Sequence, residues 1–224
     1  FFFIEINPRI QVEHTVTEEV TGIDLVKAQI LIAEGEKIGT NIALPSQSEI
    51  RVHGHAIQCR ITTEDPVNDF VPDYGKIIAY RSASGFGIRL DAGTAAAGAI
   101  VMPYYDSLLV KITSKARDVE ECRRRMDRAL REFRIRGVKT NLVFLETLIN
   151  HPTFINCNYN TQFIDTEKSL YIYKARRDRA SKVITFLGNV VVNGNKEVYN
   201  RSIPKTLLNP SIPLSDISIK KNDY

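Results

Sequence analysis

Apolar and polar residues alternate along residues 4–13, the first patterned stretch of the chain. The aliphatic side chains on one face of an extended chain are Ile4, Ile6, Ile10 and Val12. Since successive side chains of a strand point to opposite sides, the alternation predicts a half-buried strand. Pro8 donates no backbone hydrogen bond, so we expect the regular strand to stop near residue 6 and continue as an extended loop.

A helix is expected directly after this strand. Thr15 and Glu18 have the spacing of a capping box, and apolar residues recur at helical intervals as far as Gly35. Residues 36–50 show no regular pattern and predict a connection.

The middle of the chain predicts a small sheet with helices. Short apolar stretches separated by Pro and Gly turns predict strands at 55–61, 76–81, 87–90 and 107–113. Asp118 precedes a run with helical spacing that stops before Gly137, and another helix is expected over 141–149.

The last part of the chain predicts one more helix, a short strand and a linker. The helix is expected over about 174–187 and the strand over the valines at 190–192. Beyond them, three prolines stand among polar residues and indicate a linker. The whole pattern predicts an α+β protein with an antiparallel sheet.

Composition adds few constraints. The 224 residues are 43% apolar and 25% charged, which is typical of globular proteins. No run approaches the roughly 18 apolar residues of a membrane span, and the first residues do not have the pattern of a signal peptide. Because Phe1 stands inside the predicted strand, we expect the chain to be part of a longer protein. Three distant cysteines, Cys59, Cys122 and Cys157, fit neither a disulfide framework nor a zinc site, which indicates a reducing compartment.

Positive charge is concentrated in two arginine clusters although the net charge is only +4. The clusters comprise Arg123, Arg124, Arg125, Arg128, Arg131, Arg134 and Arg136, then Arg176, Arg177 and Arg179. They indicate an anionic partner. They lack the interleaved aromatic residues and motifs of nucleic-acid binders, so we expect no nucleic acid.

The polar face of residues 4–13 carries groups that suit metal and anion chemistry. Glu5 and Asn7 offer oxygen ligands of the kind that magnesium prefers, and Arg9 can grip a planar oxyanion with two hydrogen bonds. Glu13 could act as a general base if it were partly buried. On spacing alone, an ordinary solvated strand face is the preferred explanation of the same residues.

Longer stretches resemble a known family. Residues 3–14 read Phe-Ile-Glu-Ile-Asn-Pro-Arg-Ile-Gln-Val-Glu-His and resemble the biotin carboxylase signature at the end of an ATP-grasp fold. Further segments of biotin-dependent carboxylases follow in the family's order, at 54–66 (Gly-His-Ala-Ile-Gln-Cys-Arg-Ile-Thr-Thr-Glu-Asp-Pro), 104–111 (Tyr-Tyr-Asp-Ser-Leu-Leu-Val-Lys) and 136–141 (Arg-Gly-Val-Lys-Thr-Asn). The resemblance covers residues 1 to about 193. It implies that 1–50 end an ATP-grasp domain, that 51–168 form the biotin carboxylase C-terminal domain, and that 169–224 form a linker toward a carboxyltransferase domain.

The resemblance also implies a reaction and a site. In the family, ATP phosphorylates bicarbonate, and the carboxyl group is transferred to a ring nitrogen of biotin. By position, the resemblance implies a base at Glu13, a cation stabilising the biotin enolate at Arg60, and a further catalytic contact at Arg9. Bicarbonate contacts are implied at Arg9, Gln11 and the backbone of Val12, and metal and ATP contacts at Glu5 and Asn7. The implied cofactors are ATP, Mg²⁺ or Mn²⁺, and biotin carried on a domain outside this chain. Without the resemblance, Arg60 is a sheet-surface residue that shares a face with Ala56 and Gln58.

The C-terminal part of the chain indicates which members of the family it resembles most. Residues 176–182 and 186–194 resemble the segment that joins the biotin carboxylase and carboxyltransferase domains in single-chain members that convert pyruvate to oxaloacetate. His14-Thr15, where acyl-CoA members commonly have His-Pro, favours the same group. In that group the linker helps to bind acetyl-CoA as activator. The positions implied are Arg176, Asp178 and Arg179, with Arg134 at the end of the basic helix; a solvated helix face is the alternative.

The resemblance also implies an oligomer, and two alternative functions remain open. Phe86 and Arg89 match positions near a subunit interface, so we expect a homo-oligomer. The alternatives are an acetyl-CoA or propionyl-CoA carboxylase, or a non-catalytic assembly and effector-binding module. The sequence lacks the family's glycine-rich phosphate lid and biotinylation motif, so we expect the isolated chain to be inactive. We expect it in the cytoplasm, or in the mitochondrial matrix of a eukaryote, with no membrane contact.

Overall fold

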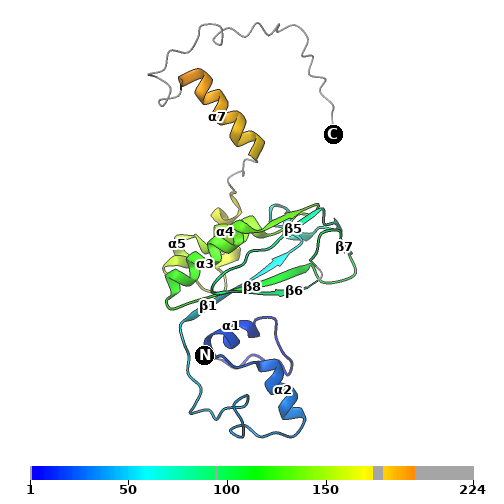
Figure 1. Ribbon diagram of the computed structural model, residues 1–224, viewed down its shortest axis with the longest axis vertical. Helices are drawn as coiled ribbons and strands as arrows, with labels where there is room; N and C mark the ends of the chain where they lie inside the picture. The colour runs from blue at the N-terminus through cyan, green and yellow to red at the C-terminus, as the bar shows by residue number, and fades with distance from the viewer. Residues whose placement is uncertain (1, 94, 174–178, 195–224) are drawn as a thin grey trace. The chain divides into compact units, whose positions relative to one another are not determined.

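Figure 1 shows a computed structural model of the chain, which describes residues 2–93, 95–173 and 179–194. The chain divides into two units, residues 1–173 and 174–224, and each is considered by itself. No helix among the described residues is both long and apolar enough to cross a bilayer.

A three-stranded antiparallel sheet is the centre of the first unit. It has the order β1-β8-β6, with β1 at His55–Thr62, β8 at Leu108–Ala116 and β6 at Ile88–Ala92. The register places Gln58 opposite Thr113, and Thr113 opposite Arg89. The strands expected at 55–61, 87–90 and 107–113 are therefore confirmed.

The single strand expected at 76–81 is wrong, because the chain changes partner in the middle of that stretch. β4 (Gly75–Lys76) pairs with β7 (Ile100–Val101), and β5 (Ala79–Arg81) pairs with β9 (Arg134–Arg136). The backbone N–H of Ile77 still donates to Ala99 O at 2.9 Å, whereas that of Ile78 donates to Arg136 O at 2.7 Å. A two-stranded ladder of β2 (Glu64–Asp65) and β3 (Val71–Pro72) flanks the short 3₁₀ helix η1, Pro66–Asn68.

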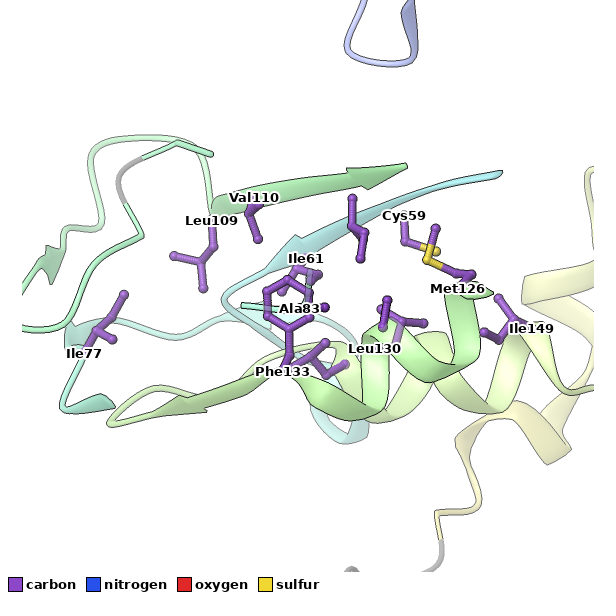
Figure 2. Close-up of a cluster of buried hydrophobic side chains, with 13 residues drawn as sticks. Cys59, Ile61, Ile77, Ala83, Leu109, Val110, Met126, Leu130, Phe133 and Ile149 are labelled. Atoms are coloured by element: carbon purple, nitrogen blue, oxygen red, sulfur yellow. The ribbon is translucent and has the colours of Figure 1, made fainter. Parts of the chain in front are cut away.

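The core lies between one face of the sheet and helix α3, Val119–Glu132 (Figure 2). As expected, Asp118 caps this helix by accepting a hydrogen bond from the N–H of Glu121 at 2.8 Å. The fully buried members of the core include Ile61, Ile77, Leu109, Val110, Ile112, Met126, Leu130 and Ile149. Each such side chain contributes about 1.5–3 kcal/mol by leaving water, so this face fixes the sheet in place.

Four short helical segments follow α3. Helix α4, Leu142–Ile149, confirms the helix expected there, and α5 (Pro152–Ile155), α6 (Phe163–Thr166) and the 3₁₀ helix η2 (Lys168–Tyr171) come after it. Their apolar side chains form a second cluster, whose buried members are Phe144, Phe163 and Leu170.

The strand expected near residues 4–6 is wrong. Residues 2–10 are extended or irregular and exposed, and the side chains of Ile4 and Ile6 are 88% and 76% exposed. Within the described residues no strand pairs with this segment. An exposed extended chain without a partner strand makes its backbone hydrogen bonds to water and buries neither face, so alternation alone does not make it part of a sheet.

The one long helix expected after Thr15 is two helices, α1 (His14–Thr21) and α2 (Leu25–Ala33). Gly22 ends α1 in a left-handed conformation, with φ of +73°. Asp24 then caps α2 by accepting from the N–H of Lys27. The break is therefore encoded by a C-terminal glycine followed by an N-cap aspartate, a combination typical of a helix end and a new start.

In the second unit, helix α7 spans Arg179–Asn193, so the strand expected at 190–192 is wrong. The valines continue the helix, and Gly194, with φ of +75°, donates its N–H to Val190 O at 2.9 Å. A glycine in this conformation is a common helix stop, and it outweighs the strand preference of three consecutive valines. The linker expected beyond residue 194 lies outside the described residues.

Candidate active site

The face of the sheet opposite α3 carries the segment that leads into α1 (Figure 1). Here Nη2 of Arg60, on β1, lies 2.8 Å from Oε2 of Glu13. The two side chains are 51% and 55% exposed, so the pair remains open to solvent. The structure thus brings together two of the three expected catalytic residues, although Glu13 is more exposed than the partial burial that we expected for a base.

The carbonyl of Val12 is held by the same face. It accepts a hydrogen bond from Nε2 of Gln58 at 2.9 Å and a longer one from Nζ of Lys111 at 3.4 Å. Both donors are on neighbouring strands, so they hold the backbone that precedes Glu13 at a defined place on the sheet.

His14 has a structural environment. Its Nδ1 lies 2.6 Å from Gln11 O, and because a carbonyl can only accept, Nδ1 carries a proton in this contact. Its Nε2 lies 3.8 Å from Oε2 of Glu18. Both ring nitrogens therefore face groups of the same turn, which agrees with leaving His14 out of the catalytic set.

Glu5, Asn7 and Arg9 do not reach the Glu13–Arg60 pair. Nδ2 of Asn7 donates to Oε1 of Glu5 at 3.2 Å, and Arg9 makes only a long contact of 3.5 Å with Ile10 O. The described residues contain no cluster of three His, Cys, Asp or Glu residues suited to a metal. Two oxygen donors on one exposed segment fit magnesium only if nucleotide phosphates and water complete its six ligands.

Sequence reasoning missed several residues that shape this site. A hollow of about 460 Å³ lies beside Arg60 and Val12, and its polar lining includes Glu64, Ser107 and Asn141. Nδ2 of Asn141 donates to Arg60 O at 2.9 Å, while its Oδ1 accepts from the N–H of Thr62 at 3.0 Å. Asn141 therefore fixes the backbone that carries Arg60.

Glu64 is fixed in a similar way. It accepts hydrogen bonds from the hydroxyls of Ser107 at 2.6 Å and Thr62 at 3.0 Å. Glu64, Ser107 and Asn141 all lie in the segments that carried the family resemblance, and that was the only signal in the sequence that could have found them.

The expected interface residues lie at the other edge of the sheet. Phe86 is 86% exposed, with the Arg125 guanidinium 4.9 Å from its ring centroid. Nη1 of Arg89 binds Oε2 of Glu18 at 2.6 Å, and two further contacts of 2.9 and 3.0 Å go to Asp91. Partial burial lowers the pKa of Arg89, but the hydrogen bonds to Asp91 and Glu18 outweigh it and raise the pKa overall.

Of the four residues expected at the activator site, the structure describes the side chain of Arg134 alone. Arg134 lies in β9 and is exposed, so its expected place at a helix end is wrong: α3 stops at Glu132 and the chain turns into a strand. Arg176 and Asp178 lie outside the described residues, as does the side chain of Arg179.

Comparison with known proteins identifies the class. Residues 58–166 match the family described as biotin carboxylase C-terminal domain, and residues 1–41 match the carbamoyl-phosphate synthase L chain ATP binding domain. The Glu13–Arg60 pair therefore joins the two matched regions. These matches, together with the mixed helix and antiparallel-sheet fold, make the chain homologous to the biotin carboxylase part of biotin-dependent carboxylases.

The relatives specify the protein more closely. Pyruvate carboxylase of Bacillus subtilis is 52% identical over 195 residues, and that of Staphylococcus aureus is 53% identical over 205 residues. The alignments cover 87% and 91% of this chain but 17% and 18% of those proteins, so the chain spans less than a fifth of their length. The chain is thus homologous to the biotin carboxylase part of pyruvate carboxylase.

Solved structures agree with this assignment. A variant of Rhizobium etli pyruvate carboxylase, solved with the allosteric activator acetyl coenzyme-A, matches with a TM-score of 0.78 and 61% identity, covering 91% of this chain and 20% of that one. The biotin carboxylase domain dimer of Hydrogenobacter thermophilus 2-oxoglutarate carboxylase, in complex with MgADP, ADP and bicarbonate, matches with a TM-score of 0.73 and 40% identity, covering 78% and 37%.

Proposed function

We propose that this chain supplies the bicarbonate end of a biotin carboxylase active site within a longer enzyme. That enzyme uses ATP and bicarbonate to carboxylate biotin, and passes the carboxyl group on to pyruvate to form oxaloacetate. The inference rests on the Glu13–Arg60 pair, which joins groups 47 positions apart in sequence at a contact of 2.8 Å.

The pair suits the chemistry of proton removal and charge stabilisation. An ion pair whose side chains are half exposed contributes at most about 1 kcal/mol to stability, so folding gives little reason for it. Glu13 is accessible to take a proton from bicarbonate, and Arg60 is a permanent cation beside it that can stabilise negative charge developing on biotin. Biotin, when bound, supplies the nitrogen that accepts the carboxyl group.

The remaining site residues would bind substrates. Arg9, Gln11 and the backbone of Val12 would contact bicarbonate, with Arg9 placing a second cation at the reacting oxyanion. Glu5 and Asn7 would hold Mg²⁺ or Mn²⁺ together with ATP. Each of these assignments extends the family resemblance to a position of this chain.

Pyruvate as acceptor has support from the relatives. The pyruvate carboxylases of Bacillus subtilis and Staphylococcus aureus are 52% and 53% identical to this chain and that of Rhizobium etli is 61% identical, compared with 40% for the 2-oxoglutarate carboxylase. On this basis we propose that 1–50, 51–168 and 169–224 are the ATP-grasp end, the biotin carboxylase C-terminal domain and a linker. The three free cysteines favour a reducing compartment, either the cytoplasm or the mitochondrial matrix.

Transfer of label tests the proposed reaction. The full-length protein that contains this chain, given ATP, Mg²⁺ and labelled bicarbonate, should pass label to biotin and then to pyruvate, but not to acetyl-CoA or propionyl-CoA. Label in an acyl-CoA product would select the alternative carboxylases. A full-length protein that labels neither biotin nor any acceptor would favour the non-catalytic assembly module.

Activation by acetyl-CoA tests the linker assignment separately. We expect Arg176, Asp178, Arg179 and Arg134 to form the activator site, and Phe86 and Arg89 to lie near a subunit contact. Each charge-assisted contact with a phosphate is worth roughly 1.5–3 kcal/mol, so replacing Arg176 and Arg179 by Gln should raise the half-maximal acetyl-CoA concentration at least about tenfold. An activation curve that superimposes on wild type would exclude these arginines from the site.

A further inference from the structure

One row of side chains crosses the face of the sheet that α1 covers. Gln58, Thr113 and Arg89 lie opposite one another on β1, β8 and β6. Each contacts a different point of residues 12–18. Gln58 donates to Val12 O, the hydroxyl of Thr113 is hydrogen-bonded to that of Thr15 at 2.8 Å, and Arg89 binds Glu18 at 2.6 Å. The three points are evenly spaced along the chain, at positions 12, 15 and 18.

The spacing has a physical consequence. Residues three apart lie on the same side of a helical turn, so Thr15 and Glu18 hold one face of α1. The backbone carbonyl of Val12, two residues before the helix, adds a third held point. Glu13 lies between the first two held points, and its carboxylate is left to meet Arg60 in the next row of the sheet. Lys111 and Asp91 complete that second row, with Lys111 on Val12 O and Asp91 on Arg89.

We propose that the row of Gln58, Thr113 and Arg89 is a positioning device for Glu13, with the Thr15–Thr113 hydroxyl pair at its centre. The proposal rests on the role of Glu13 given above and adds the residues that aim it. The central pair is the most buried part of the row, because both threonines are fully buried whereas Gln58 and Arg89 are partly exposed.

The hydroxyl pair sets a separation that apolar atoms cannot reproduce. Two hydroxyl oxygens approach to 2.8 Å, whereas two carbon atoms in contact need about 3.5–4.0 Å. Replacing both threonines by valine keeps their shape and leaves no unpaired buried hydroxyl, so folding should be nearly unaffected. The first turn of α1 should nevertheless move about 1 Å from the sheet, taking Glu13 with it, and displacements of that size can reduce turnover by as much as about 100-fold.

The test is bicarbonate-dependent ATP hydrolysis by the full-length protein carrying Thr15→Val and Thr113→Val together. We expect kcat to fall at least about tenfold, with thermal unfolding close to wild type and KM for ATP unchanged, since Glu5 and Asn7 make no contact with the row. The double serine variant keeps both hydroxyls and should retain most of the activity.

Ser114→Ala is the matched control. Ser114 is the next residue on β8, is fully buried and donates to Cys122 O at 3.0 Å, but it faces α3 instead of α1. Its loss should lower stability without lowering kcat. An equal fall of kcat in Ser114→Ala, or wild-type kcat in the valine variant, would overturn the proposal. If the valine variant does not fold, Gln58→Met, which removes the shorter of the two hydrogen bonds to Val12 O, should show the same selective fall in kcat. Wild-type kcat in Gln58→Met would then overturn the proposal.

Glu13→Gln, measured in parallel, separates the two hypotheses. If Glu13→Gln is inactive while the valine variant matches wild type, the positioning row fails and the proposed function stands. If Glu13→Gln keeps wild-type turnover, the proposed function itself fails.

Discussion

Arg89 and Arg60 lie on the same face of one sheet and each pairs with a glutamate, yet their replacement should have different effects on stability. The Glu18 side chain is 8% exposed and that of Arg89 is 32% exposed, whereas both members of the Arg60 pair are more than half exposed. Arg89→Gln would leave a buried carboxylate with the N–H of Leu25 as its nearest remaining donor, at 2.8 Å.

The magnitudes follow from this burial. Removing one partner of a fully buried ion pair costs about 3–5 kcal/mol, and since Arg89 is partly open to water we expect about 2 kcal/mol here. Arg60→Gln should cost less than about 1 kcal/mol, because exposed pairs contribute little. Adding Glu18→Gln to Arg89→Gln should recover part of the loss, since no charge is then left alone.

Urea denaturation of the two single variants and the double variant measures these free energies of unfolding. A loss of about 2 kcal/mol corresponds to a midpoint shift of roughly 1 M for a typical denaturant dependence. Equal midpoints for Arg89→Gln and Arg60→Gln would refute the assignment of one pair to stability and the other to chemistry.

Further predictions concern thiols, acid stability and the isolated chain. Burial raises the pKa of the Cys59 thiol to about 12, so a maleimide at pH 8 should label exposed Cys157 and spare Cys59 in the folded protein; equal labelling by mass spectrometry would contradict this. Hydrogen bonds from Arg123 and Arg124 lower the pKa of the Glu120 carboxyl from 4.5 to about 2, so their stabilising effect is present above pH 4.5 and lost as the pH falls toward 2. Glu120→Gln should therefore flatten the loss of stability between pH 4.5 and 2, and an unchanged slope would exclude the effect. The isolated chain, with bicarbonate and free biotin, should release no phosphate from ATP above a buffer blank.

Local pattern was sufficient to predict the central sheet and α3. The strands β1 and β8 and the cap at Asp118 follow from alternation, helical spacing and an N-cap residue, which are properties of neighbouring residues. The same reasoning failed where the outcome depended on partners distant in the sequence. Residues 4–6 have strand alternation, but none of the strands in the described part of the chain pairs with them, and the stretch 76–81 divides because two different strands pair with its two ends.

The candidate site shows the same limit. Glu13 and Arg60 could be paired from sequence only through the family resemblance, because nothing in their spacing brings them together. Thr15 illustrates the difference: its spacing to Glu18 predicts a capping box, yet its hydroxyl contacts Thr113, 98 positions away, and Glu18 accepts instead from Leu25 and Arg89. A polar side chain on a helix can form its hydrogen bonds within the helix or with the sheet, and the tertiary packing determines which partner it has.

Bicarbonate-dependent ATP hydrolysis by Glu13→Gln in the full-length protein tests the central claim most directly. Glutamine keeps the shape of the side chain and removes its ability to accept a proton from bicarbonate, and a general base contributes roughly 10²- to 10⁴-fold to a rate. The account predicts a loss of turnover in this range, with ATP still bound. Wild-type turnover in Glu13→Gln would contradict it.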